Sequence, residues 1–131
     1  FALNDSEVES VEAGSVPIVN AELPNAPNVS ANYMVRFNPP MGNGELIAQI
    51  DGAYYGDQFL EVTNGSGTVQ DAYNVTNLRL GWRNNNWSIS AWGKNVFDER
   101  YKAYSLDLGV LGATSFYAPP ATYGVTLEAF F

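Results

Sequence analysis

The sequence has 131 residues, enough for one small domain, and a net charge of −8 from six basic and fourteen acidic residues. So few Lys and Arg residues, scattered along the chain, argue against nucleic-acid binding, which requires clustered positive charge. The chain has no Cys, which excludes disulfides and thiolate metal ligands, and no His, which removes the commonest general base. We therefore expect neither an enzyme nor a resident cofactor.

Five segments alternate apolar and polar residues with a period of two, which is typical of strands with one apolar face. They are residues 28–37, 44–56, 76–83, 86–91 and 121–131. In the last segment, every second residue from Tyr123 to Phe131 is apolar. No helical period of useful length occurs, so the sequence predicts an all-β, antiparallel fold. Residues 1–5 fit the end of an earlier strand.

Short and long connections alternate between these segments. Residues 38–43 (NPPMGN) and 84–86 (NNN) form tight links, whereas residues 5–27, 60–71 and 97–115 form long ones. In an antiparallel meander every second link falls at the same end of the sheet. One end should therefore carry tight turns and the other long loops, which is the arrangement of outer-membrane barrels.

Charge and aromatic residues follow the same division. Eleven of the fourteen acidic residues lie in 5–27, 57–71 and 97–115, and the apolar strand faces hold none, as contact with lipid requires. Aromatic residues gather near both ends of the strands, as interface belts do. These are Phe37, Trp82, Trp87 and Phe131 by the short turns, and Tyr54, Tyr73, Phe97 and Tyr123 by the long connections.

Alternating strands also build soluble sandwiches, so a soluble β-sandwich adhesin or carbohydrate-binding module is the alternative interpretation. Two features favour the membrane: the second face carries small residues and isolated charges, and the regular alternation of links is unlike Greek-key connections. Five strands cannot close a barrel, because the smallest membrane barrels have about 8. We therefore expect an arc of a larger up-and-down barrel, in a chain that is processed or a fragment, or a separate subunit of a split barrel.

Three segments resemble, in order, the C-terminal end of the TonB-dependent outer-membrane receptors. They are LPNAP at 23–27, WGKNVFDERY at 92–101 and FYAPPATYGVTLEAFF at 116–131. The resemblance implies that residues 1–131 are the last five or so strands of a 22-stranded transmembrane barrel, without its plug domain and earlier strands. It also implies import of a scarce nutrient, such as an iron–siderophore complex, haem, cobalamin or a glycan, driven from the inner membrane.

The same resemblance implies a location and partners. The location is the outer membrane of a Gram-negative bacterium, and the partners are outer-membrane lipid, the remainder of the barrel, its plug domain and the barrel-assembly machinery. TonB would bind the N-terminal region that is absent here. No nucleic acid is expected among the partners.

Two groups of strand residues are candidate functional residues. The alternate positions of the last strand resemble the assembly signal of outer-membrane proteins and should also face lipid. They are Tyr123, Val125, Leu127, Ala129 and Phe131. Charged residues on the second strand face should point into the lumen, where we favour structural pairing and plug contact over substrate contact. They are Arg36, Asp51, Arg79, Arg83, Lys94 and Glu128.

The long connections hold two further candidate groups. Tyr101, Tyr104, Phe116 and Tyr117 could stack on a ligand or pack loop against loop, and we favour packing. Asp98, Glu99 and Asp107 could bind calcium, but their spacing fits no calcium-loop motif, so we favour a solvated or salt-bridged loop base and no metal site. In this interpretation the strand before Asn95 leaves the bilayer there.

Overall fold

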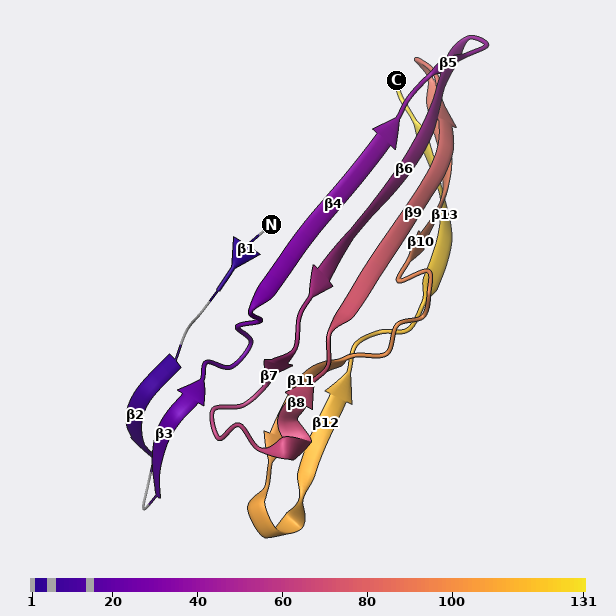
Figure 1. Ribbon diagram of the computed structural model, residues 1–131. Helices are drawn as coiled ribbons and strands as arrows, with labels where there is room; N and C mark the ends of the chain where they lie inside the picture. The colour runs from indigo at the N-terminus through magenta and orange to yellow at the C-terminus, as the bar shows by residue number, and fades with distance from the viewer. Residues whose placement is uncertain (1, 5–6, 14–15) are drawn as a thin grey trace. The chain divides into compact units, whose positions relative to one another are not determined.

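The computed structural model describes residues 2–4, 7–13 and 16–131, and within residues 7–20 it describes the backbone alone (Figure 1). Strands make up most of the chain. The two helices in the described ranges are 3₁₀ turns of three residues, η1 (Ser66–Thr68) and η2 (Gly109–Leu111), and neither can span a membrane.

The main sheet is a meander of the five predicted strands. Its order is β4 (Val29–Phe37), β6 (Gly44–Tyr55), β9 (Tyr73–Arg83), β10 (Trp87–Lys94) and β13 (Thr122–Ala129), with β1 (Ala2–Leu3) beside β4 and β5 (Pro40–Met41) beside β6. The pairs β1–β4, β9–β10 and β10–β13 are antiparallel, and Figure 1 shows the long strands in chain order. The predicted all-β antiparallel fold is confirmed, and the predicted strand end within residues 1–5 is β1.

Each long connection contains a small hairpin that the sequence pattern did not predict. These are β2 (Glu7–Ala13) with β3 (Val16–Glu22), β7 (Gln58–Phe59) with β8 (Val69–Gln70), and β11 (Lys102–Asp107) with β12 (Ala113–Tyr117). The turn between β11 and β12 closes because Gly109 and Gly112 adopt φ values of 61° and 84°, which residues other than glycine rarely adopt.

The chain divides into two compact units. We call residues 1–31, 54–73 and 100–118 the loop unit, and residues 32–53, 74–99 and 119–131 the strand unit. In the loop unit, the Lys102 ammonium donates to the Val69 carbonyl at 2.7 Å and to the Gly67 carbonyl at 3.3 Å. The Ser105 and Thr68 side chains are fully buried beside this contact region, so polar contacts as well as Leu60 fill the interior of the unit.

A stack of tyrosines also holds the loop unit together. The Tyr73 ring lies between Tyr55, at 5.2 Å between centroids, and Tyr101, at 4.2 Å and nearly parallel. Tyr73 thus packs against protein, whereas the sequence pattern had placed it in an aromatic belt.

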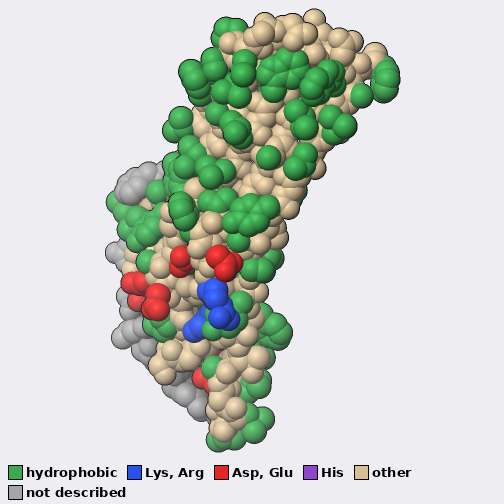
Figure 2. Space-filling view, turned by 90° about the vertical axis from the view of Figure 1, so that its right-hand side faces the viewer, with side chains coloured by type: hydrophobic (Ala, Val, Ile, Leu, Met, Phe, Trp, Pro, Cys, Tyr) green, Lys and Arg blue, Asp and Glu red, His purple; other side chains and the backbone are tan. Residues whose placement is uncertain are grey.

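In the strand unit, the apolar face is exposed. Leu80, Ile89 and Leu127 retain 59%, 42% and 72% of their accessible surface, and the buried hydrophobic residues in the described part of the chain are Ala21 and Leu60, both of the loop unit. Figure 2 shows hydrophobic side chains over the upper part of the face it presents, with no charged side chain among them. A sandwich would bury this face under a second sheet, so the soluble-sandwich interpretation is not supported.

Strand register keeps the two faces continuous from strand to strand. Ile89 lies opposite Leu127 and Ser90 opposite Thr126 in the β10–β13 pair. Leu80 lies opposite Ala91 in the β9–β10 pair. Apolar residues therefore pair with apolar ones and polar with polar, as a sheet with two different environments requires.

The link between β9 and β10 is closed by one side chain. The Asn84 side-chain oxygen accepts the backbone N–H groups of Asn86 at 2.8 Å and Trp87 at 2.9 Å. The Asn84 N–H donates to the Trp87 carbonyl at 3.0 Å. This local pattern, an Asn side chain that replaces a backbone acceptor, explains why three residues suffice for the turn.

Asn84→Ala removes both acceptor contacts and should lower the free energy of unfolding by about 1 kcal/mol, whereas Asn84→Asp keeps an acceptor and should cost less. Urea-induced unfolding measures both. Asn85→Ala is the matched control, since the Asn85 side chain makes no hydrogen bond within the described part of the chain. Equal losses in Asn84→Ala and Asn85→Ala would contradict the assigned role.

Candidate functional site

The six charged residues predicted on the second strand face lie together on that face of the strand unit. One hollow of about 400 Å³ and an adjoining hollow of about 390 Å³ are lined by all six. The first holds Arg36, Arg79, Arg83 and Glu128, and the second holds Asp51, Arg79, Lys94 and Glu128. Strands β4, β6, β9, β10 and β13 each contribute, so the sheet register assembles a continuous polar wall.

A row of hydrogen bonds crosses three strands of this wall. The Arg36 guanidinium donates to the Gln49 side-chain oxygen at 2.6 and 2.9 Å. The Gln49 amide donates to one Asp51 oxygen at 2.7 Å, and the Asn77 amide donates to the other at 2.9 Å. The two charges of the row, Arg36 and Asp51, are thus joined through the neutral amide of Gln49.

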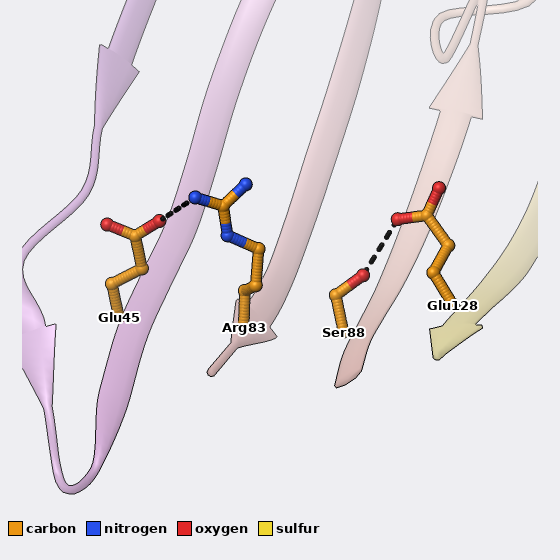
Figure 3. A network of polar contacts seen from close by, with 4 residues as sticks. All are labelled: Glu45, Arg83, Ser88 and Glu128. Atoms are coloured by element: carbon orange, nitrogen blue, oxygen red, sulfur yellow. Dashed lines mark hydrogen bonds and ion pairs between the residues drawn. The ribbon is translucent and has the colours of Figure 1, made fainter. Parts of the chain in front are cut away.

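The turn end of the wall contains two further contacts. Arg83 and Glu45 approach to 3.2 Å, and the Ser88 hydroxyl donates to Glu128 at 2.8 Å, as Figure 3 shows on four neighbouring strands. Both partners of the ion pair are well exposed, so the pair contributes only about 0–1 kcal/mol.

Most charge on the wall has no opposite charge in contact. In the described part of the chain, the contact between Arg83 and Glu45 is the one salt bridge. Arg79 donates to the Ser90 hydroxyl at 3.2 Å, and the Lys94 ammonium lies 5.7 Å from the Trp92 ring centre. Such charges need water or a polar partner over the wall, because an apolar covering would leave them unpaired.

The alternate residues of the last strand all belong to the apolar face. Tyr123, Val125 and Leu127 are 67%, 71% and 72% exposed, and Phe131 follows the end of β13 fully exposed. The Phe130 N–H donates to the Asn86 carbonyl at 2.7 Å and so ties the end of the chain to the short turn. In the described ranges β13 pairs with β10 alone.

The four loop aromatics do not form one cluster. Tyr101 is stacked on Tyr73, and Tyr117 lies under the Arg100 guanidinium at 5.0 Å. Tyr104 and Phe116 pair across the β11–β12 hairpin at 6.3 Å and remain 49% and 60% exposed. Tyr101 therefore helps to hold the loop unit together. The other three rings are exposed to the surroundings, since Tyr117 also retains 53% of its accessible surface.

The acidic residues of the third long connection serve the backbone. Asp98 accepts the Ala121 N–H at 2.8 Å, and Asp107 accepts the Gly109 N–H at 2.8 Å. The Glu99 N–H donates to the Asn95 side-chain oxygen at 3.0 Å. Within the described ranges no three acidic, His or Cys side chains come close enough to hold a metal ion.

Asn95 is the residue whose role the sequence pattern did not indicate. It is 6% exposed, with a left-handed backbone at φ 50° and with side-chain hydrogen bonds to Glu99 and Pro119. Apart from Gly, Asn is among the residues that best tolerate this conformation. An Asn directly after the strand in the motif WGKNVFDERY was therefore the one signal in the sequence that could have indicated this turn.

No protein-family model matches the sequence. The crystal structure of the ferric yersiniabactin uptake receptor FyuA from Yersinia pestis is similar to the chain, with a TM-score of 0.75 and 25% sequence identity. The similarity covers 84% of this chain and 17% of that receptor, so the chain spans a small part of the length of the protein it matches. FyuA is a TonB-dependent siderophore receptor. The chain accordingly corresponds to a part of the β-barrel of a TonB-dependent receptor.

Proposed function

We propose that the chain is the C-terminal part of the wall of an outer-membrane transporter that imports a scarce nutrient with energy delivered by TonB. The observation that carries the proposal is the pair of opposite faces in the strand unit, in a sheet similar to that of an uptake receptor. Among the substrate classes, the similarity to FyuA favours an iron–siderophore complex over haem, cobalamin or a glycan. The source would be a Gram-negative bacterium.

In this proposal the apolar face contacts hydrocarbon and the polar wall lines the lumen. Leu80, Ile89 and Leu127 would be covered by lipid tails, which costs nothing for side chains without polar atoms. The polar wall would face water and the plug domain, whose polar groups would pair with Arg36, Arg79 and Lys94. Cross-strand hydrogen bonds such as Arg36 to Gln49 and Asn77 to Asp51 already satisfy part of the wall, which supports structural and plug contact more than substrate contact.

The last strand would also be the part read during assembly. Its exposed alternate side chains and its edge without a partner in the described ranges suit recognition by strand addition, in which backbone groups pair and side chains fill pockets. The barrel-assembly machinery is the proposed reader. The first strand of the complete barrel would then take the same edge.

Removal of the gene that encodes the chain should abolish TonB-dependent uptake of a ferric siderophore, since the barrel wall is incomplete without these strands. Uptake of ⁵⁵Fe-labelled siderophores by the source bacterium, with and without TonB, measures this. The complemented strain is the control. Wild-type uptake of siderophores, haem, cobalamin and glycans in the mutant would contradict the proposed transport.

Val125→Arg places a charge on the apolar face at mid-strand and should destabilise the inserted barrel by about 2–4 kcal/mol. Thr126→Arg, the matched control, places the same charge on the polar wall. It loses the hydrogen bond from Trp92 and should cost about 1 kcal/mol. The amount of heat-modifiable receptor in isolated outer membranes compares the two, and an equal loss for both variants would contradict the assigned faces.

Deletion of Phe131 should lower the amount of assembled receptor several-fold without a matching change in the stability of the barrel that does assemble. Phe131 lies beyond the strand and contributes a recognised side chain instead of a strand contact. Phe130→Ala is the control because the hydrogen bond of Phe130 to Asn86 is made by its backbone N–H. Equal amounts of assembled receptor in wild type and deletion would argue against the assembly role.

A further inference from the structure

The segment between β10 and β13 is tied to both neighbouring strands through Asn95. The Asn95 N–H donates to the Asn77 side chain at 3.1 Å, and the Val96 N–H donates to the Thr76 carbonyl at 2.9 Å, which fixes the end of β10 against β9. The Asn95 side-chain amide donates to the Pro119 carbonyl at 3.4 Å. Pro119 lies three residues before β13 begins at Thr122. One buried side chain thus connects the end of β10 with the segment that leads into the last strand.

Asp98 makes the second connection to that segment. Its carboxylate accepts the Ala121 N–H at 2.8 Å, directly before the first residue of β13. Its own N–H donates to the Asn95 carbonyl at 2.9 Å, and its φ of 53° places it in the left-handed region. Two residues in this uncommon conformation within four positions indicate a turn whose shape is fixed by its hydrogen bonds.

Two pairs of an aromatic residue with a glycine adjoin these contacts in the β10–β13 register. Tyr123 lies opposite Gly93, and a Cβ at Gly93 would come within 2.8 Å of the Tyr123 ring. Trp92 lies opposite Gly124, and a Cβ there would come within 2.7 Å of the indole. The Tyr123 hydroxyl also donates to the Val96 carbonyl at 3.2 Å. Each ring therefore occupies space that exists only because its partner is glycine.

The alternating pattern alone leaves the register of β13 open. A slip by one residue would turn every apolar side chain to the wrong face, but a slip by two residues would keep both faces intact. After such a slip Tyr123 would lie opposite Ala91 in place of Gly93, and Gly124 would lie opposite Ser90 in place of Trp92. The glycine pairs and the two turn contacts therefore distinguish the native register from the slips that the pattern tolerates.

We propose that Asn95, Asp98 and the two glycine–aromatic pairs form a register lock, which sets the position of β13 against β10 and hence where the terminal side chains end. The lock is a positioning device for assembly and rests on the proposed barrel function. It assigns a role to the motif WGKNVFDERY that involves no ligand. Asn95 and Asp98 act here through the backbone of the segment before β13.

Residues 1–131 contain no Cys, so disulfides engineered between pairs of these residues give a direct test. In the complete receptor, Ile89→Cys with Leu127→Cys reports the native register, because these residues lie opposite each other. Ile89→Cys with Ala129→Cys, or with Val125→Cys, reports a slip by two residues in either direction. A disulfide needs Cα atoms about 4.4–6.8 Å apart, so the slipped pairs should link only in slipped barrels.

In an otherwise wild-type receptor extracted from outer membranes, the native pair should link and the slipped pairs should not. Asn95→Ala with Asp98→Ala should raise the linked fraction of a slipped pair several-fold, and Asp98→Asn, which keeps an acceptor, should not. Asn86→Ala, at the opposite end of the same strand pair, is the control because its contacts are through the backbone.

If the assembled double variant forms the native disulfide at the wild-type level and no slipped disulfides, the proposed lock is wrong. If the double variant does not assemble, Asp98→Ala alone decides: slipped links above wild type support the lock, and wild-type levels refute it. Failure of the proposed function is separate, since it would show as absence of the wild-type chain from the outer membrane or as unchanged nutrient uptake after gene removal.

Discussion

The structure depends on one constraint, the need of each strand to present different chemistry to its two sides while its backbone groups pair with neighbouring strands. Leu80 and Arg79 are adjacent in β9 and belong to opposite faces, and the same holds for Ile89 and Ser90 in β10. Backbone N–H and C=O groups that face hydrocarbon must be satisfied within the sheet. Antiparallel pairing meets this requirement, so side chains on the outer face can be entirely apolar.

The same constraint explains why the charged and polar residues of the strand unit gather on one face of the sheet. Charges such as Arg36 and Arg79 are tolerated because the register collects them on one side with Gln49, Ser90 and Glu128. Few of them are neutralised by an opposite charge in contact, so the wall remains open to water or to a polar partner. A sheet that bound only lipid would have no need of these residues, whereas the wall of a plugged, water-filled transporter would.

Period-two alternation predicted all five long strands and their faces because that signal is local and repeats over six or more residues. The hairpins β2–β3, β7–β8 and β11–β12 were missed since short strands in a long connection give little alternation to detect. Asn95 was missed for a different reason. Its partners Asn77 and Pro119 lie 18 and 24 residues away, so its role follows from packing that no local pattern contains.

The central claim, that one strand face meets hydrocarbon and the other water, is tested most directly by single cysteines placed at position 123 and at positions 125 to 128 of β13 in the complete receptor in membranes. We predict spin labels at positions 123, 125 and 127 to be relaxed mainly by lipid-soluble oxygen. Labels at positions 126 and 128 should be relaxed mainly by a water-soluble nickel complex. The same accessibility at odd and even positions would contradict the account.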